Sequence, residues 1–132
     1  MKNIDFVVLY VESAAVSANF YAALLGKEPA ESSPTFAMFA FESGLGLGLW
    51  SRQAVDPAVV AAGSGVELNF SVADNATVDA MYADWRGRGI SIAQVPTTHV
   101  GCGYTFVALD PDGHRLRVFA MLKEHIEKPI PV

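Results

Sequence analysis

Few side chains in this sequence combine nucleophilic, basic or metal-binding chemistry with an informative position. The single cysteine, Cys102, follows His99 in a glycine-rich segment, and a thiol beside an imidazole could act as a nucleophile with its base. Nothing in the segment supplies a third group that would orient the imidazole, so an ordinary thiol is the favoured interpretation. The histidines His99, His114 and His125 do not have the spacing of a metal site. A lone cysteine also excludes an intrachain disulfide and a zinc site built from several cysteines.

Glu67 is the carboxylate with the most informative surroundings. It lies in the segment Val66–Val72, where apolar and polar residues alternate. In a strand, this alternation places Glu67 with Asn69 on one face and Phe70 on the opposite face. A carboxylate in that position could be a general base, a metal ligand, a polar contact for a small molecule or half of an ion pair.

The elements that must position these groups belong to a compact domain. With 52% apolar and 17% charged residues among 132, the chain can bury a core. The net charge of −5 is spread out without a basic patch, which argues against a nucleic-acid partner. No apolar run approaches the roughly 18–20 residues that cross a bilayer, so no membrane partner is expected. Met1–Asn3 leads into a strand-like segment without a signal peptide, and we expect a cytoplasmic protein.

The sequence partly repeats itself. Aligning the two halves places Phe6 on Glu67, Val11 on Val72, Tyr21 on Tyr82 and Gly26 on Gly87. Each half shows a strand, an amphipathic helix that ends at a glycine, and further strands. We therefore predict an α+β fold of two tandem βαβββ modules in a single domain, residues 1–132. The modules cover about residues 4–52 and 66–120, and a tail covers 121–132.

Both helices have predicted caps and buried stripes. In the first module a strand over Ile4–Val11 precedes a helix that is capped by Ser13 and ended by Gly26. Its buried stripe is predicted to be Val16, Phe20 and Leu24. In the second module Asp74 or Asn75 caps a helix that is closed by Gly87 and Gly89, with the stripe Val78, Met81, Tyr82 and Trp85.

Two hairpins complete the modules. The pairs are Phe36–Phe41 with Leu45–Trp50, and Tyr104–Leu109 with Arg115–Ala120, and a short strand is predicted over Ile90–Val95. We expect a curved mixed sheet with the helices on its outer face and a cup on the other face.

A tryptophan beside two glycines is a candidate ligand surface. Gly46, Gly48 and Trp50 share one face of their strand, and the glycines are expected to leave open space where a flat ligand could stack on the indole. The alternative is a tryptophan packed across a sheet or a dimer seam. Phe6 and Tyr104 would add apolar walls to a ligand site, or serve only as core.

Several short motifs, in this order and at these spacings, resemble the vicinal oxygen chelate superfamily of glyoxalases, bleomycin-resistance proteins and dioxygenases, over about residues 4–120. They are Val7-Val8-Leu9-Tyr10-Val11, Phe20-Tyr21, Leu25-Gly26 and Asp110-Pro111-Asp112-Gly113-His114. Three further segments are similar to the phenazine antibiotic-resistance proteins of that superfamily, which bind the drug without destroying it. These are Lys27-Glu28-Pro29, Leu49-Trp50-Ser51 and Gly103-Tyr104-Thr105-Phe106.

This resemblance implies four metal-ligand positions, near the start of the first strand of each module and after each hairpin glycine. Here those positions hold Phe6, Gly48, Glu67 and Arg117. Only Glu67 is a usual ligand, and Arg117 would bring its own positive charge. We therefore expect no metal and no other cofactor. Glu67 and Arg117 are expected to pair, either as a structural substitute for the metal or as polar contacts for a ligand.

The function predicted from the sequence is sequestration of a planar aromatic, phenazine-like antibiotic by a homodimer, which would give drug resistance. The ligand-binding residues would be Trp50, Phe6, Tyr104, Glu67, Asn69, Arg117 and Gly48, with no catalytic residue. One alternative is a lyase, isomerase or dioxygenase that uses Glu67 as metal ligand or general base. A second is a structural or regulatory dimer without a small ligand.

Overall fold

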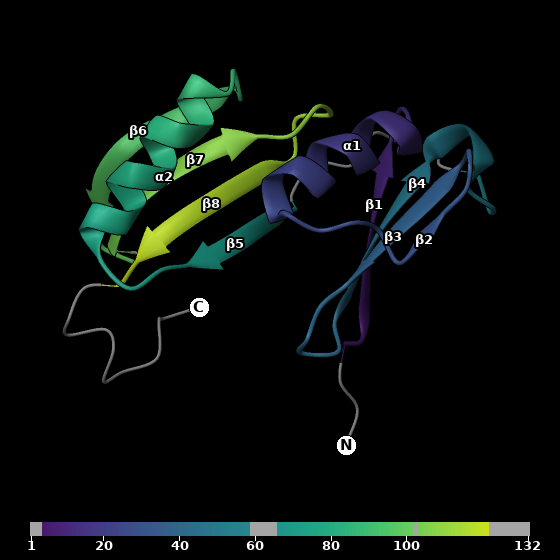
Figure 1. The fold of residues 1–132 in the computed structure, drawn as a ribbon, viewed down its shortest axis with the longest axis horizontal. Coiled ribbons are helices and arrows are strands. Elements are labelled where there is room, and N and C mark those ends of the chain that lie inside the picture. Colours follow the sequence, from purple (N-terminus) through teal and green to yellow (C-terminus); the bar gives the residue numbers. More distant parts are fainter. Residues whose placement is uncertain (1–3, 59–65, 102, 122–132) are drawn as a thin grey trace. The chain divides into compact units, whose positions relative to one another are not determined.

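A computed structural model of the chain describes residues 4–58, 66–101 and 103–121 (Figure 1). The chain divides into two compact units, Met1–Gly63 and Ser64–Val132. Within the described residues, each unit holds one α-helix and one four-stranded mixed sheet.

The first unit contains the purple-to-blue elements of Figure 1. They are β1 (Phe6–Val11), α1 (Ala14–Leu25), β2 (Glu31–Ser32), β3 (Phe36–Ala40), β4 (Gly46–Ser51) and a 3₁₀ turn, η1 (Arg52–Ala54). The sequence did not predict β2 or η1, since both are too short to show a periodic pattern.

The second unit repeats this plan with β5 (Glu67–Ser71), α2 (Asn75–Gly87), β6 (Ile92–His99), β7 (Gly103–Leu109) and β8 (Arg115–Ala120). The strand predicted over Ile90–Val95 exists as β6, but it starts later and runs on to His99. Two register irregularities against β7 interrupt β6, which explains why its pattern does not alternate cleanly.

The two sheets have the same topology. Their strand orders are β1-β4-β3-β2 and β5-β8-β7-β6, with one parallel pair followed by antiparallel pairs in each. This confirms the predicted α+β fold of tandem βαβββ modules. The register also makes four positions equivalent. Phe6 is the first residue of β1 as Glu67 is of β5, while Gly48 and Arg117 are both third in the strand that pairs in parallel.

Helix α1 has the predicted ends but a different buried face. Its N-cap Ser13 accepts a hydrogen bond from the Val16 amide at 3.2 Å, and Gly26 ends it in the left-handed region at φ 65°. The predicted stripe is wrong, because Val16 is 56% exposed. The buried residues are Ala14, Ser17, Ala18 and Tyr21. No charged residue lies in Ala14–Leu25, so hydrophobicity gave the helix no marked polar side from which to orient it.

Helix α2 follows its prediction. Asp74 is the cap, and its carboxylate accepts from the Thr77 amide at 2.8 Å and from the Thr77 hydroxyl at 2.6 Å. Val78 and Trp85 of the predicted stripe are buried. Trp85 meets the rings of Phe70 and Phe106 edge to face, with centroids 5.7 and 5.3 Å away, so α2 covers the Phe70 face of its sheet.

Each helix covers one face of the sheet in its own unit and leaves the other face without a helix. In the first unit the helix side buries Leu9, Val11, Ala37, Phe39 and Leu49. In the second unit it buries Phe106, Leu116 and Val118. We call the uncovered faces the open face of the first unit and the open face of the second unit. Within the described ranges, neither helix has the length and apolarity that a bilayer span requires.

Candidate functional site

The open face of the first unit carries a group of aromatic side chains, Phe6 on β1, Phe36 on β3 and Trp50 on β4, which we call the aromatic cluster. The Phe6 and Phe36 ring centroids lie 6.4 Å apart, and those of Phe36 and Trp50 lie 6.3 Å apart. The Phe36 and Trp50 planes are perpendicular, so Phe36 does not stack flat on the indole. Phe6 is 42% exposed, and Tyr10, the register partner of Trp50, is 40% exposed. The cluster is therefore an apolar surface that a flat molecule could contact.

Gly46 and Gly48 lie beneath this cluster rather than beside an empty slot. A Cβ atom at Gly46 would come within 2.5 Å of Phe6 Cδ1, and one at Gly48 within 2.9 Å of Phe6 Cζ and 3.1 Å of the Phe36 ring. The prediction of open space over these glycines is therefore wrong, because the two phenylalanine rings fill that space. The glycines instead allow Phe6 to lie directly on β4.

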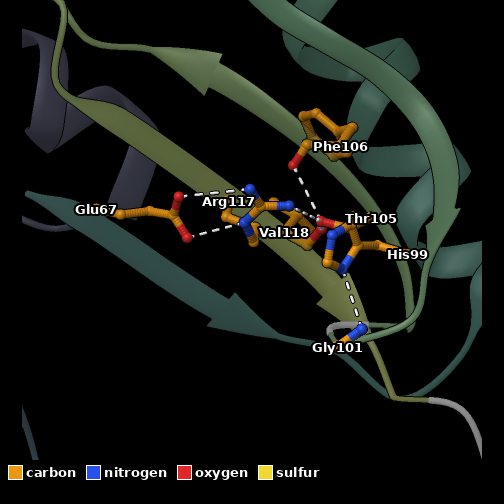
Figure 2. A network of polar contacts seen from close by, with 7 residues as sticks. All are labelled: Glu67, His99, Gly101, Thr105, Phe106, Arg117 and Val118. Carbon is orange, nitrogen blue, oxygen red and sulfur yellow. Dashed lines mark hydrogen bonds and ion pairs between the residues drawn. The ribbon is translucent and has the colours of Figure 1, made fainter. Parts of the chain in front are cut away.

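The open face of the second unit carries an ion pair at its centre, as Figure 2 shows. Arg117 Nε donates to Glu67 Oε1 at 2.8 Å, and Nη2 donates to Oε2 at 3.5 Å. The Arg117 side chain is 15% exposed and that of Glu67 is 30% exposed. The predicted pairing is thus present, in a partly buried setting where the carboxylate compensates the guanidinium.

Thr105 on β7 holds the other end of this guanidinium. Its hydroxyl accepts from Arg117 Nη1 at 3.2 Å and donates to the carbonyl of Val118 at 2.8 Å (Figure 2). Thr105 is fully buried. The sequence interpretation missed this residue. The only signal was strand alternation, which turns the residue between Tyr104 and Phe106 to the face opposite theirs but does not show which of the two faces the helix covers.

Three more polar side chains share the open face of the second unit. Asn69 is the register partner of Arg117 across the parallel pair, and Arg115 is two residues before Arg117 on the same strand. His99 pairs with Gly103 at the end of β6, which places it on the same side as Thr105. Its Nδ1 accepts from the Gly101 amide at 3.0 Å.

Tyr104 does not join the polar group of Glu67 and Arg117. Its hydroxyl donates to Asp79 Oδ1 on α2 at 2.6 Å, so the side chain lies on the helix side of the sheet. This hydrogen bond to Asp79 raises the pKa of Tyr104 above its ordinary value, with smaller contributions from burial and from the Asp79 charge. The placement of Tyr104 with Glu67 and Arg117 around one ligand is therefore corrected.

Of the histidine and cysteine candidates, the structure describes His99 and His114. His114 lies in the turn before β8, where its Nδ1 is 2.8 Å from Asp110 Oδ2. The same Asp110 accepts from the backbone amides of Asp112 and His114, which fixes the turn. Cys102 and His125 lie outside the described residues, so the proposed pair of Cys102 with His99 is not tested.

The residues at the four equivalent positions do not fit a divalent metal. Phe6 and Gly48 offer no side-chain donor, and Arg117 is a cation already paired with Glu67. Across residues 4–58, 66–101 and 103–121, no three His, Cys, Asp or Glu side chains gather into a potential metal site. In each unit, the two residues at these positions contact each other. The contact is apolar in the first unit, where Phe6 lies on Gly48, and ionic in the second, where Glu67 binds Arg117.

Tandem βαβββ modules with equivalent positions on their open faces define a protein of the vicinal oxygen chelate type. The model of the Glyoxalase/Bleomycin resistance protein/Dioxygenase superfamily matches residues 3–118, and the chain belongs to this superfamily. A comparison with curated proteins gives no match.

Solved structures with the same fold come from several bacteria. A protein from Agrobacterium tumefaciens, determined by solution NMR, is 46% identical, covering 92% of this chain and 99% of that one with a TM-score of 0.79. A glyoxalase/bleomycin resistance protein/dioxygenase from Nocardioides is 25% identical, covering 93% and 85%, also with a TM-score of 0.79. A lactoylglutathione lyase from Agrobacterium tumefaciens is 20% identical, covering 91% and 94% with a TM-score of 0.72, and shows the shared fold alone.

Proposed function

We propose that this protein binds a planar aromatic small molecule of the phenazine kind without transforming it, and that sequestration of such a molecule gives drug resistance. The aromatic cluster of the first unit supports the proposal. Three rings from three neighbouring strands gather on a face that α1 does not cover, and Phe6 remains 42% exposed. Partly exposed aromatic side chains are the surface on which flat ligands stack.

Within the cluster, Trp50 is proposed as the main stacking surface and Phe6 as a movable side wall. Because Phe36 meets the indole at 90°, a ligand could lie against Trp50 without displacing a stacked ring. Gly48 supports Phe6 from below and would contribute by leaving room for that ring. A ligand of about 20 heavy atoms at roughly −0.3 kcal/mol per atom would bind at about −6 kcal/mol, which is tens of micromolar.

Fluorescence titration tests this proposal, because the two tryptophans differ in environment. Trp85 is 4% exposed on the sheet-facing side of α2, whereas Trp50 lies on the open face. Phenazine and acridine are expected to quench Trp50 saturably. By calorimetry, Trp50→Ala should weaken binding tenfold or more while the protein stays folded. Phe20→Ala is the matched control, since Phe20 is an aromatic residue of α1 that packs on Tyr21, and it should leave affinity unchanged.

An unfolded Trp50→Ala variant would instead assign the indole a structural role. In that case Phe6→Leu provides the second test, because Phe6 is exposed enough to be replaced without opening the core. Failure of every planar aromatic to quench the wild-type protein would favour a structural or regulatory protein over a binding protein.

An enzyme of the same superfamily is the second candidate. The observation that favours it is the Glu67 carboxylate, 30% exposed on an open face and placed where the resemblance implies a ligand. Against it, both carboxylate oxygens already accept from Arg117. Formation of lactoylglutathione that a chelator abolishes, together with stoichiometric metal in gently purified protein, would establish the enzyme.

We further propose that the chain forms a homodimer. Large apolar side chains are exposed on both units, including Val16 at 56% and Val95 at 59%, and a partner surface would cover such groups. Light scattering after size exclusion is expected to give twice the 14.1 kDa chain mass. A monomer at micromolar concentration would contradict the proposal.

A further inference from the structure

We infer that the open face of the second unit is a binding site for a carboxylate group, in which the fixed guanidinium of Arg117 supplies the positive charge. The inference concerns Arg117, Thr105, Asn69 and Arg115, and it does not depend on the aromatic cluster.

The Arg117 guanidinium is held in place, but not all of its N–H donors are bound. Of its five N–H donors, one on Nε and one on Nη2 bind Glu67, and one on Nη1 binds Thr105. In the part of the chain that the structure describes, one N–H on each terminal nitrogen therefore has no partner. Because the Arg117 side chain is only 15% exposed, these donors gain from an acceptor brought by a ligand.

Side chains close to Arg117 on the same face also favour a ligand with a negatively charged oxygen. Asn69 lies opposite Arg117 in the parallel register and is exposed, so its amide can donate to a bound oxygen. Arg115 is exposed on the same face of β8. Strands β5, β7 and β8 thus place two arginines and one glutamate on this face. Its local charge is positive although the whole chain carries −5.

The charges on this face favour a carboxylate over a phosphate. Glu67 remains bound to the same guanidinium, so any anion that reaches Arg117 also approaches a negative charge. The two arginines and Glu67 leave this face with one net positive charge, which balances a monoanion, whereas a dianionic phosphate would bring a second charge that has no partner. A planar carboxylate also matches two N–H donors that lie in the plane of a guanidinium. The geometry therefore points to a monoanionic carboxylate.

NMR titration of the full chain tests this inference. Sodium benzoate is the probe, benzamide is its neutral analogue, and inorganic phosphate is the competing anion, all at constant ionic strength. Benzoate should shift the Arg117 Nε–H resonance saturably. Benzamide should not shift it, and phosphate should bind several-fold more weakly.

Three variants sharpen the result. Arg117→Met should weaken benzoate binding tenfold or more, as expected for the loss of charge-assisted hydrogen bonds. Because this change leaves Glu67 without its partner, Glu67→Gln with Arg117→Met repeats the test without a stranded charge. Glu67→Gln alone should strengthen benzoate binding several-fold, since it removes the opposing charge. The control Arg88→Gln alters the arginine at the C-cap of α2, which pairs with Asp84, and it should leave benzoate binding unchanged.

The possible outcomes test the existence of the site and the choice of ligand separately. A linear, unsaturable shift in the wild-type protein, or wild-type affinity in the double variant, would overturn the site. Equal affinity for phosphate, or no gain from Glu67→Gln, would overturn the choice of a monoanionic carboxylate.

Discussion

The coupling between Glu67 and Arg117 gives a quantitative prediction about the second unit. The perturbation is a double-mutant cycle with Glu67→Gln, Arg117→Met and the combination, in which methionine avoids a new amide–amide contact. Glu67→Gln removes the negative charge at one end of a 2.8 Å contact on a partly buried face, and Arg117→Met removes the charged donor at the other end.

The magnitude follows from distance and burial. Two unit charges about 4 Å apart interact by about 4 kcal/mol at an effective dielectric of about 20. Two effects oppose this attraction. Glu67 is 30% exposed and keeps part of its hydration, and the burial of Arg117 costs desolvation free energy. We expect a coupling free energy of about 1–2 kcal/mol, with Glu67→Gln the more damaging single change because the guanidinium left behind is the less exposed group.

The assay is urea unfolding at neutral pH, and α2 provides a matched comparison. Asp84 and Arg88 form a similar pair at 3.0 Å, but their side chains are 52% and 49% exposed. Their cycle should give a coupling of only about 0.3–0.5 kcal/mol. Equal couplings for the two pairs, or none for Glu67 with Arg117, would refute the argument that burial makes the central pair strong.

Three further predictions concern packing and pH. Gly46→Ala places a Cβ atom on the Phe6 ring and should lower the free energy of unfolding by about 1–3 kcal/mol, measured in urea. The hydrogen bonds from the Thr77 hydroxyl and then the Thr77 amide hold the pKa of Asp74 below its ordinary 3.8, so the stability lost in Asp74→Ala, measured in urea, should be full at neutral pH and shrink as pH falls below 3.8. The pKa of Tyr104 is raised by Asp79, so the stability lost in Tyr104→Phe should disappear only as pH rises above 10, and absorbance titration should show late ionisation.

Much of the fold was predictable because local signals agreed with one another. Strict alternation in Val66–Val72 gave the faces of β5, and the spacing of Val78 and Trp85 gave the buried side of α2. The internal repeat then predicted the same succession of strand, helix and further strands in both units. Where the pattern was ambiguous the prediction was wrong, as in α1, whose uncharged sequence marks no solvent side.

The residues of the site could be predicted better than the contacts between them. Pairing of Glu67 with Arg117 was expected because strand alternation places Glu67 on the open face and the superfamily resemblance implies that Arg117 lies there too, and the structure confirms the pair. The space over Gly48 could not be predicted, because a glycine shows only that something approaches closely and does not show that Phe6 does so. Thr105 was missed because its role depends on which face of β7 meets the helix, which the contact of Tyr104 with Asp79 reveals.

At the positions where the superfamily resemblance implies metal ligands, one unit has the Phe6 ring on Gly48 and the other has the ion pair of Glu67 with Arg117, and we propose that the protein binds its ligand without a metal. The most direct measurement is a calorimetric titration of phenazine into chelator-treated protein, repeated after zinc, nickel, iron or manganese is returned. We predict saturable binding with the same affinity, within about twofold, in every sample. Binding or turnover that appears only when a metal is restored would contradict the claim.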